Sequence, residues 1–266
     1  MRLISTLIFI LGFSSIAIAD SGNAIQQAVN AKHRSVENVA RDQYRHPAET
    51  LAFFGIEPNM SVLEILPGRG WYTEILAPLL KEQGKLTIAH FGSNNPNEYL
   101  RGIYLNHVSL LEANSDIYGE VKVVDFQDGD NYLEIIPDNS QDMVVTFRSA
   151  HNWIRYGGIE KIYPAIYRVL KKGGILGVVQ HRASDEDDYT QSAEKGYVPE
   201  PYLIKLLEDI GFELVEKSEI NANPNDLRNH PDGVWSLPPS LRTKGKEAEF
   251  LAIGESDRMT LRFIKL

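Results

Sequence analysis

The stretch that most constrains the fold runs from residue 62 to residue 80. Residues 62–66 (VLEIL) are apolar apart from one acid, which predicts a short buried strand. Pro67 and Gly68 end the strand, and Gly70 allows a sharp turn. Apolar residues then recur at helical spacing, at Ile75, Leu76, Leu79 and Leu80. Strand, glycine loop and helix in this order open a doubly wound α/β sheet, which binds ligands outside the carboxyl ends of its strands.

The glycine loop separates two classes of cofactor-binding fold. A G-x-G-x-x-G dinucleotide fingerprint requires a glycine where Thr73 stands, so the loop disfavours a nicotinamide or flavin fold. An acid followed by G-x-G resembles the first motif of class I S-adenosylmethionine-dependent methyltransferases, although Leu66 stands where many members carry another glycine. The resemblance implies binding of S-adenosyl-L-methionine, with contacts from Glu64, Pro67, Gly68, Gly70 and Trp71.

Two further blocks carry the same resemblance. Residues 44–56, together with residues 62–64 and 70–78, are similar to a family of exported bacterial proteins that are predicted class I methyltransferases. Residues 171–174 (KKGG), followed by residues 175–180, are similar to the entry to the fifth strand of class I methyltransferases. The resemblance covers nearly the whole mature chain and implies a fold and a cofactor, but no particular reaction.

The expected fold class is α/β, with a Rossmann-like class I methyltransferase sheet of seven strands, the last one antiparallel, and an N-terminal helical extension. Helices are expected at residues 99–111, 163–170 and 201–210. Strands are expected at residues 62–66, 85–91, 121–126, 142–147, 175–180, 212–218 and 259–264.

The N-terminus is predicted to be a targeting signal. Arg2, an apolar run to Ile18 and an A-x-A site ending at Ala19 predict a signal peptide over residues 1–19 and a periplasmic or secreted protein. The run is shorter than the roughly 20 residues that span a bilayer, so no stable membrane insertion is expected after cleavage. An uncleaved anchor is the alternative.

Two parts follow the predicted signal peptide. Residues 20–55 are expected to be an N-terminal helical segment that serves as a lid, and residues 56–266 a methyltransferase-like domain. Within the segment, residues 24–45 are expected to form one helix and residues 47–54 a second. Near their junction, Arg41, Asp42 and Arg45 are either a solvated helix face or part of a lid over the cofactor edge.

Composition limits the possible partners. The chain has a formal net charge of −9 and no basic run, which argues against nucleic acid. It contains no cysteine, so packing rather than disulfide bonds must stabilise it. A small-molecule substrate is the expected partner, and the sequence makes no prediction of an oligomeric state.

Polar residues after the other expected strands complete the cofactor site that the resemblance implies. His90 stands where most members carry the acid that binds the ribose, and Asp125 or Asp128 stands where an acid accepts the adenine amino group. Arg148 and Asn152 follow the strand next to the glycine loop and are expected to contact the cofactor.

Two histidines are the candidate catalytic residues. His151 and His181 follow neighbouring expected strands, and an imidazole is suited to removing a proton from the acceptor at neutral pH. We expect His151 to be the general base and His181 the second candidate. Arg148 or Arg182 is expected to hold an anionic group of the substrate. The polar insertion at residues 221–239 is the candidate substrate surface, together with Tyr189 and residues 197–200.

The function that these features favour is methyl transfer from S-adenosyl-L-methionine to a small molecule, with a histidine general base. One alternative is a non-catalytic small-molecule-binding protein on the same fold. A less favoured alternative is a hydrolase or zinc site in which His90, His151 and His181 hold the metal.

Overall fold

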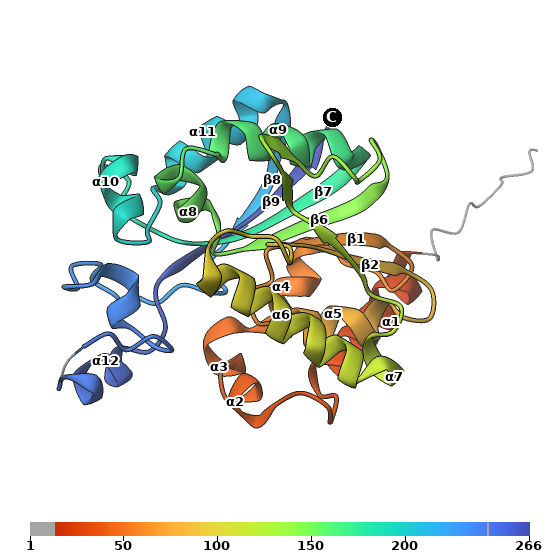
Figure 1. Ribbon diagram of the computed structural model, residues 1–266, viewed down its shortest axis with the longest axis horizontal. Helices are drawn as coiled ribbons and strands as arrows, with labels where there is room; N and C mark the ends of the chain where they lie inside the picture. Colours follow the sequence, from red (N-terminus) through yellow and green to blue (C-terminus); the bar gives the residue numbers. More distant parts are fainter. Residues whose placement is uncertain (1–13, 244) are drawn as a thin grey trace, which may run out of the picture.

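The computed structural model of the chain describes residues 14–243 and 245–266. Its centre is a seven-stranded sheet with the order β3-β2-β1-β6-β7-β9-β8 (Figure 1). Only β9 runs antiparallel to its neighbours within this sheet. The predicted fold class is therefore confirmed. The strand bounds are β1 Ser61–Ile65, β2 Lys85–His90, β3 Lys122–Asp125, β6 Gln141–Phe147, β7 Leu170–His181, β8 Phe212–Ser218 and β9 Arg258–Lys265. A separate ribbon pairs β4 Gln127–Asp128 with β5 Asn131–Tyr132.

The strand order reverses between β1 and β6, which lie side by side with Glu64 opposite Val145. The chain passes from β1 outward to β2 and β3 on one side and from β6 to β7 on the other. Ligands of open α/β sheets bind at such a switch point, outside the carboxyl ends of the strands. The loops after β1, β6 and β7 are therefore the place to look for a site.

Two apolar layers cover the sheet (Figure 1). One core cluster joins the sheet to α8, α9 and α11, and the other joins it to α1, α4 and α5. The helix bounds are α1 Ser14–Val29, α2 Val36–Val39, α3 Asp42–Arg45, α4 Pro47–Phe54, α5 Thr73–Leu80, α6 Glu98–Ala113, α7 Ser115–Tyr118, α8 Ala150–Arg155, α9 Ile159–Val169, α10 Tyr189–Glu194, α11 Glu200–Ile210 and α12 Glu247–Ile253, with a short 3₁₀ helix at Gly233–Ser236.

The single helix expected over residues 24–45 is wrong. Helix α1 ends at Val29, where the Arg34 side chain turns back and donates to the Val29 carbonyl at 2.8 Å. The Ser35 hydroxyl then accepts from the Asn38 amide and begins the short helix α2. Serine favours this N-cap position over a helix interior, and that preference interrupts the expected helix. The second expected helix, residues 47–54, is confirmed as α4.

Much of the segment at residues 20–55 belongs to the core. Ile25 and Leu51 are buried with α5 under the sheet, and the Phe54 ring lies against Gly177 of β7. A role as a lid can therefore apply only to the part between α1 and α4. Residues 1–13 of the predicted signal peptide lie outside the described residues, and α1 crosses the expected cleavage point after Ala19.

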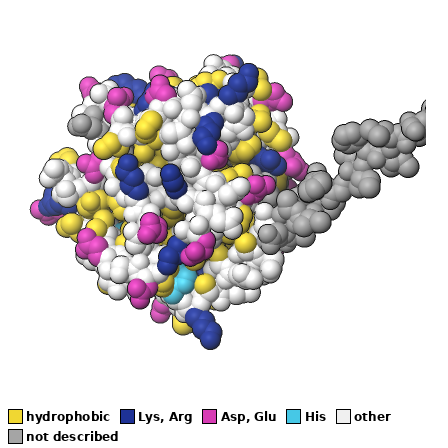
Figure 2. Space-filling view, turned by 90° about the vertical axis from the view of Figure 1, so that its right-hand side faces the viewer, with side chains coloured by type: hydrophobic (Ala, Val, Ile, Leu, Met, Phe, Trp, Pro, Cys, Tyr) yellow, Lys and Arg dark blue, Asp and Glu magenta, His cyan; other side chains and the backbone are white. Residues whose placement is uncertain are grey.

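Surface composition is mixed where it can be seen. On the face drawn in Figure 2, basic and acidic side chains are interspersed, unlike the clustered basic surface of a nucleic-acid-binding protein. Among the described residues, no helix combines the length and the apolar content needed to cross a bilayer.

Candidate functional site

The loop after β1 has the backbone geometry that the sequence predicts. Leu66, Gly68 and Gly70 all have positive φ, of 48°, 64° and 83°. A Cβ atom on Gly68 would meet nothing within 4 Å, whereas one on Gly70 would lie 2.4 Å from Nε2 of His107 in α6. Gly68 thus offers an open backbone face for a ligand, and Gly70 makes room for a neighbouring helix. Pro67 begins the turn, and its carbonyl accepts from the Gly70 amide at 3.1 Å.

Glu64 lies beneath this loop and is 1% exposed. Its Oε2 accepts a 2.7 Å hydrogen bond from the Thr73 hydroxyl at the start of α5. Burial raises the pKa of Glu64 to about 7, although the Thr73 bond works in the opposite direction. The carboxyl group therefore ties the strand to the helix that follows the loop.

Trp71 faces away from the loop and into the N-terminal segment. Its indole N–H donates to the Asn38 carbonyl at 3.0 Å, and the guanidinium groups of Arg34 and Arg45 lie 5.2 and 4.6 Å from the ring centroid. The predicted cofactor contact by Trp71 is therefore not supported, because its ring is occupied by these cation–π contacts.

His90 serves the glycine loop rather than a ribose. Its Nδ1 accepts from the Phe91 amide at 2.7 Å, so Nε2 carries the proton and donates to the Gly68 carbonyl at 3.1 Å. Burial lowers the pKa of His90 to about 4, which keeps the ring neutral. With both nitrogens occupied, His90 has no acceptor for a ribose hydroxyl, and the predicted role is wrong.

Asp125 ends β3 opposite His90 and is exposed. A Cβ atom on Gly92, just after β2, would lie 2.7 Å from Oδ1 of Asp125. The carboxylate therefore reaches across from β3 to the exit of β2. The predicted contact of this carboxylate with the adenine amino group stays a prediction.

His151 and Asn152 lie on α8, directly after β6, and Arg148 precedes them with a φ of 62°. The His151 ring is tied to β7, since Nε2 of Gln180 lies 3.2 Å from its Nδ1. Burial lowers the pKa of His151 to about 3. Asn152 is partly exposed on the same helix.

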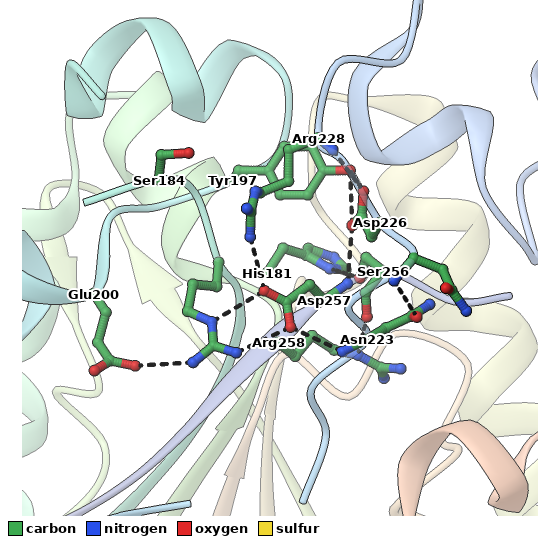
Figure 3. Close-up of polar contacts among 12 residues, drawn as sticks. His181, Ser184, Tyr197, Glu200, Asn223, Asp226, Arg228, Ser256, Asp257 and Arg258 are labelled. Atoms are coloured by element: carbon green, nitrogen blue, oxygen red, sulfur yellow. Dashed lines mark hydrogen bonds and ion pairs between the residues drawn. The ribbon is translucent and has the colours of Figure 1, made fainter. Parts of the chain in front are cut away.

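His181 ends β7 and lies beside His151, with ring centroids 5.5 Å apart. Its Nδ1 lies 2.5 Å from the Ser256 hydroxyl, next to Asp257 and Arg258 (Figure 3). Burial, and then the charges around it, lower the pKa of His181 well below its usual value. The two predicted catalytic histidines therefore share one site.

The insertion expected as a substrate surface reaches these histidines. The Trp235 ring lies 5.9 Å from that of His151, and Tyr197 lies 6.2 Å from His181. The Tyr197 hydroxyl contacts the Asp226 carboxylate at 3.2 Å, which holds the insertion against the sheet (Figure 3).

Arg182 is not available for a substrate. Its guanidinium pairs with Asp257 at 3.0 Å and Glu219 at 2.6 Å, and lies 3.6 Å from Glu200. The prediction that it holds an anionic group is therefore wrong, and Arg148 remains as the candidate.

The sequence analysis missed one group of residues. Arg45 is 2% exposed, and its Nε donates to Glu255 at 3.0 Å. Arg41 and Arg258 contact the same carboxylate, at 2.7 and 3.2 Å. The interpretation of Arg41 and Arg45 as a solvated helix face is wrong. No local pattern could have shown this, because Glu255 lies 210 residues from Arg45.

The alternative of a histidine metal site is not supported. His90 lies beside His107, with centroids 5.4 Å apart, while His151 lies beside His181. Among the described residues, no group of three or more His, Cys, Asp or Glu side chains is placed to hold a metal.

Solved structures with this architecture settle the fold. A SAM-dependent methyltransferase from Aquifex aeolicus matches over 92% of this chain and 98% of its own, with a TM-score of 0.57 and 15% identity. The chain has the class I methyltransferase fold. The [4+2]-cyclase SpnF matches with a TM-score of 0.56 and 16% identity over 93% of this chain and 94% of its own.

Curated relatives with similar sequences carry methyltransferase names. A sterol 24-C-methyltransferase from Yarrowia lipolytica is 27% identical over 81% of this chain and 54% of its own length. Another, from Gibberella zeae, is 31% identical over 58% of this chain and 37% of its own. The chain thus spans about half the length of the curated relatives it matches, or less. No protein-family model matches it.

Proposed function

We propose that this protein is an S-adenosyl-L-methionine-dependent methyltransferase that acts on a small molecule. One observation carries the proposal: the glycine loop after β1 presents the open backbone of Gly68 at the switch point of a class I methyltransferase fold. The methyltransferase names of the curated relatives support it. Asp125 would accept from the adenine amino group, Asn152 would border the cofactor from the β6 side, and Arg148 would face the acceptor molecule.

The proposed base is His181 rather than His151. Gln180 donates to Nδ1 of His151, so the proton of the neutral ring is on Nε2, where it can only be donated. Nδ1 of His181 contacts Ser256 and can carry the proton, which leaves Nε2 free to accept one from the acceptor molecule. The cofactor, when bound, supplies an activated methyl group, and the protein aligns the acceptor with it.

Calorimetry with S-adenosylhomocysteine tests the proposal. We expect the purified protein to bind it and expect H181Q to bind it equally well, since His181 would act on the acceptor. Absence of binding to the wild-type protein would contradict the cofactor assignment. A loss of affinity in H181Q would contradict the proposed role of the histidine as a base.

The alternative is a non-catalytic small-molecule-binding protein on the same fold, because His90 stands in place of the ribose-binding acid and both of its ring nitrogens are occupied. Incubation with methyl-labelled S-adenosylmethionine and fractionated small-molecule extracts separates the two. Transfer of label to an acceptor supports a methyltransferase, and tight binding without transfer supports the alternative.

We also propose that the protein is exported and is bacterial. The support is Arg2, the apolar run and the A-x-A site of residues 1–19, with the resemblance described above; the curated relatives that match are fungal. N-terminal sequencing of the protein from its native host is the test. A mature chain that begins at Asp20 would support export with cleavage after Ala19, and an intact Met1 would contradict a cleaved signal peptide.

A further inference from the structure

Three guanidinium groups pair with one carboxylate beside the candidate site, and a fourth, that of Arg148, interacts with it electrostatically. We call Arg41, Arg45, Arg148 and Arg258 the arginine cluster, with Glu255 at its centre. Glu255 is 3% exposed and pairs with Arg41, Arg45 and Arg258 at 2.7, 3.0 and 3.2 Å. Burial would raise the pKa of Glu255, but Arg45, Arg258 and Arg41 hold it at about 2. The carboxylate is therefore charged, and the cluster keeps an excess of positive charge.

Some nitrogens of these guanidinium groups have no partner in the part of the chain that the structure describes. Among the described residues, the buried nitrogens Nη1 of Arg45 and Nη2 of Arg41 have no hydrogen-bond partner. The Arg148 side chain makes no hydrogen bond to any other described residue, although Arg148 is only partly exposed. Buried charged groups in proteins are nearly always paired, because an unpaired one loses its solvation without compensation. The arrangement is what a protein needs to bind an anion.

The arginine cluster adjoins the proposed base. Arg258 lies directly opposite His181 in the register of β7 and β9, and Arg148 leaves the end of β6 just before His151. A pocket of about 280 Å³ opens between α3 and residues 221–225 and 252–255, and Glu255 and Arg258 form part of its wall. This pocket gives a small molecule access to Glu255 and Arg258 of the cluster.

We propose that the arginine cluster binds an oxyanion of the acceptor molecule, a carboxylate or a phosphate, and so selects an anionic small molecule. This inference rests on the proposed function. An anionic acceptor would differ from the sterol in the name of the curated relatives, since a sterol carries no carboxylate or phosphate. Planar guanidinium groups match both oxyanions, and the excess of cations over Glu255 is the basis of the selection.

The test uses inorganic phosphate as the probe and calorimetry as the readout, with and without saturating S-adenosylhomocysteine. We expect wild type to bind phosphate in both conditions. R148Q should bind it at least about tenfold more weakly, because a charge-assisted hydrogen bond is lost. R148Q is the first variant because Arg148 makes no side-chain hydrogen bond within the described chain and its loss should not unfold the protein.

Two further variants complete the design. R168Q is the matched control, because Arg168 pairs with Asp138 and bonds the carbonyls of Leu133 and Ile136, away from the cluster. It should bind phosphate like wild type. E255Q removes the carboxylate from the cluster and should bind phosphate more tightly than wild type.

The results separate the possible sources of the anion. Equal phosphate affinity in R148Q and R168Q would overturn the proposal. So would competition between phosphate and S-adenosylhomocysteine, together with loss of S-adenosylhomocysteine affinity in R148Q, since the cluster would then hold the carboxylate of the cofactor. If S-adenosylhomocysteine does not bind at all, the proposed function fails, whereas phosphate binding that depends on Arg148 would still support the anion site.

Discussion

The side-chain amide of Gln180 lies 3.2 Å from Nδ1 of His151 and determines which ring nitrogen carries the proton. The side-chain amide of Gln180 cannot flip, because its Oε1 accepts from the Ala150 amide at 3.1 Å. Nε2 of Gln180 must therefore face His151 as a donor, and the neutral imidazole keeps its proton on Nε2. His151, whose position after β6 suggests a general base, is therefore a hydrogen-bond donor at Nε2.

Replacing Gln180 by glutamate should reverse this tautomer. A carboxylate at position 180 can still accept from Ala150 but can only accept from His151, so the proton should move to Nδ1. The new charge should raise the pKa of His151 from about 3 by about one unit or more. Imidazole nitrogen chemical shifts measured by NMR against pH report both changes. Q191E, on the exposed face of α10, is the control, and an unchanged tautomer in Q180E would contradict the assignment.

Alanine at the two loop glycines should have different effects. G68A places a methyl group in open space at a φ of 64°, so we expect about 1 kcal/mol of destabilisation but a large loss of S-adenosylhomocysteine affinity. G70A drives its methyl group into His107, so we expect about 3 kcal/mol of destabilisation. Denaturant unfolding and calorimetry measure the two effects. Wild-type affinity in G68A would show that no ligand approaches this loop.

Removing the Glu64 carboxyl group should change how stability depends on pH. Its pKa in the folded protein, about 7, lies above the ordinary 4.5, so between these pH values the folded state holds a proton that the unfolded state has released. Glu64 therefore lowers the free energy of unfolding as pH rises through this interval. The E64Q variant has no proton to lose and lacks this decrease. The free energy of unfolding of E64Q relative to wild type should therefore increase by about 3 kcal/mol between pH 4.5 and pH 8. E82Q, at an exposed site, serves as the control, and a pH-independent difference would contradict the burial argument.

The contact between α4 and the sheet should tolerate no added atom. In G177A the new Cβ would lie 2.7 Å from Cδ2 of Phe54, which should destabilise the protein by about 2 kcal/mol. G102A is the control, because a Cβ at Gly102 in α6 meets nothing within 4 Å and alanine favours a helix, so stability should rise slightly. Thermal unfolding of both variants compares them. Equal stability of G177A and wild type would mean that α4 is not packed as described.

Local patterns account for most of the predicted fold. Strand β8 begins at Phe212 and ends at Ser218 as predicted, because Gly211, at a φ of 117°, marks the turn before an alternating strand. The strand–loop–helix unit around Gly68 and Gly70 was predicted for the same reason. Each of these elements is determined by residues that are close to it in the sequence.

Partners that come from elsewhere in the chain could not be predicted. His90 occupies the position expected for a ribose-binding residue, but the carbonyl of Gly68, 22 residues away, takes its proton. In the sequence, Arg148 and Arg182 are equivalent candidates for binding an anion, because each follows one of two neighbouring strands. Only the folded chain shows that three carboxylates surround Arg182, while Arg148 lies beside other arginines. Such roles depend on the tertiary contacts each side chain meets.

The pairs between Arg41 or Arg45 and Glu255 join two parts of the chain that are more than 200 residues apart. Helix α3 cannot loosen without exposing the charge of Glu255, and the segment between α12 and β9 cannot move without uncovering those arginines. The two ends should therefore open as one cooperative unit in hydrogen exchange. Truncating either end would then also release the other, and neither could be trimmed independently of the core.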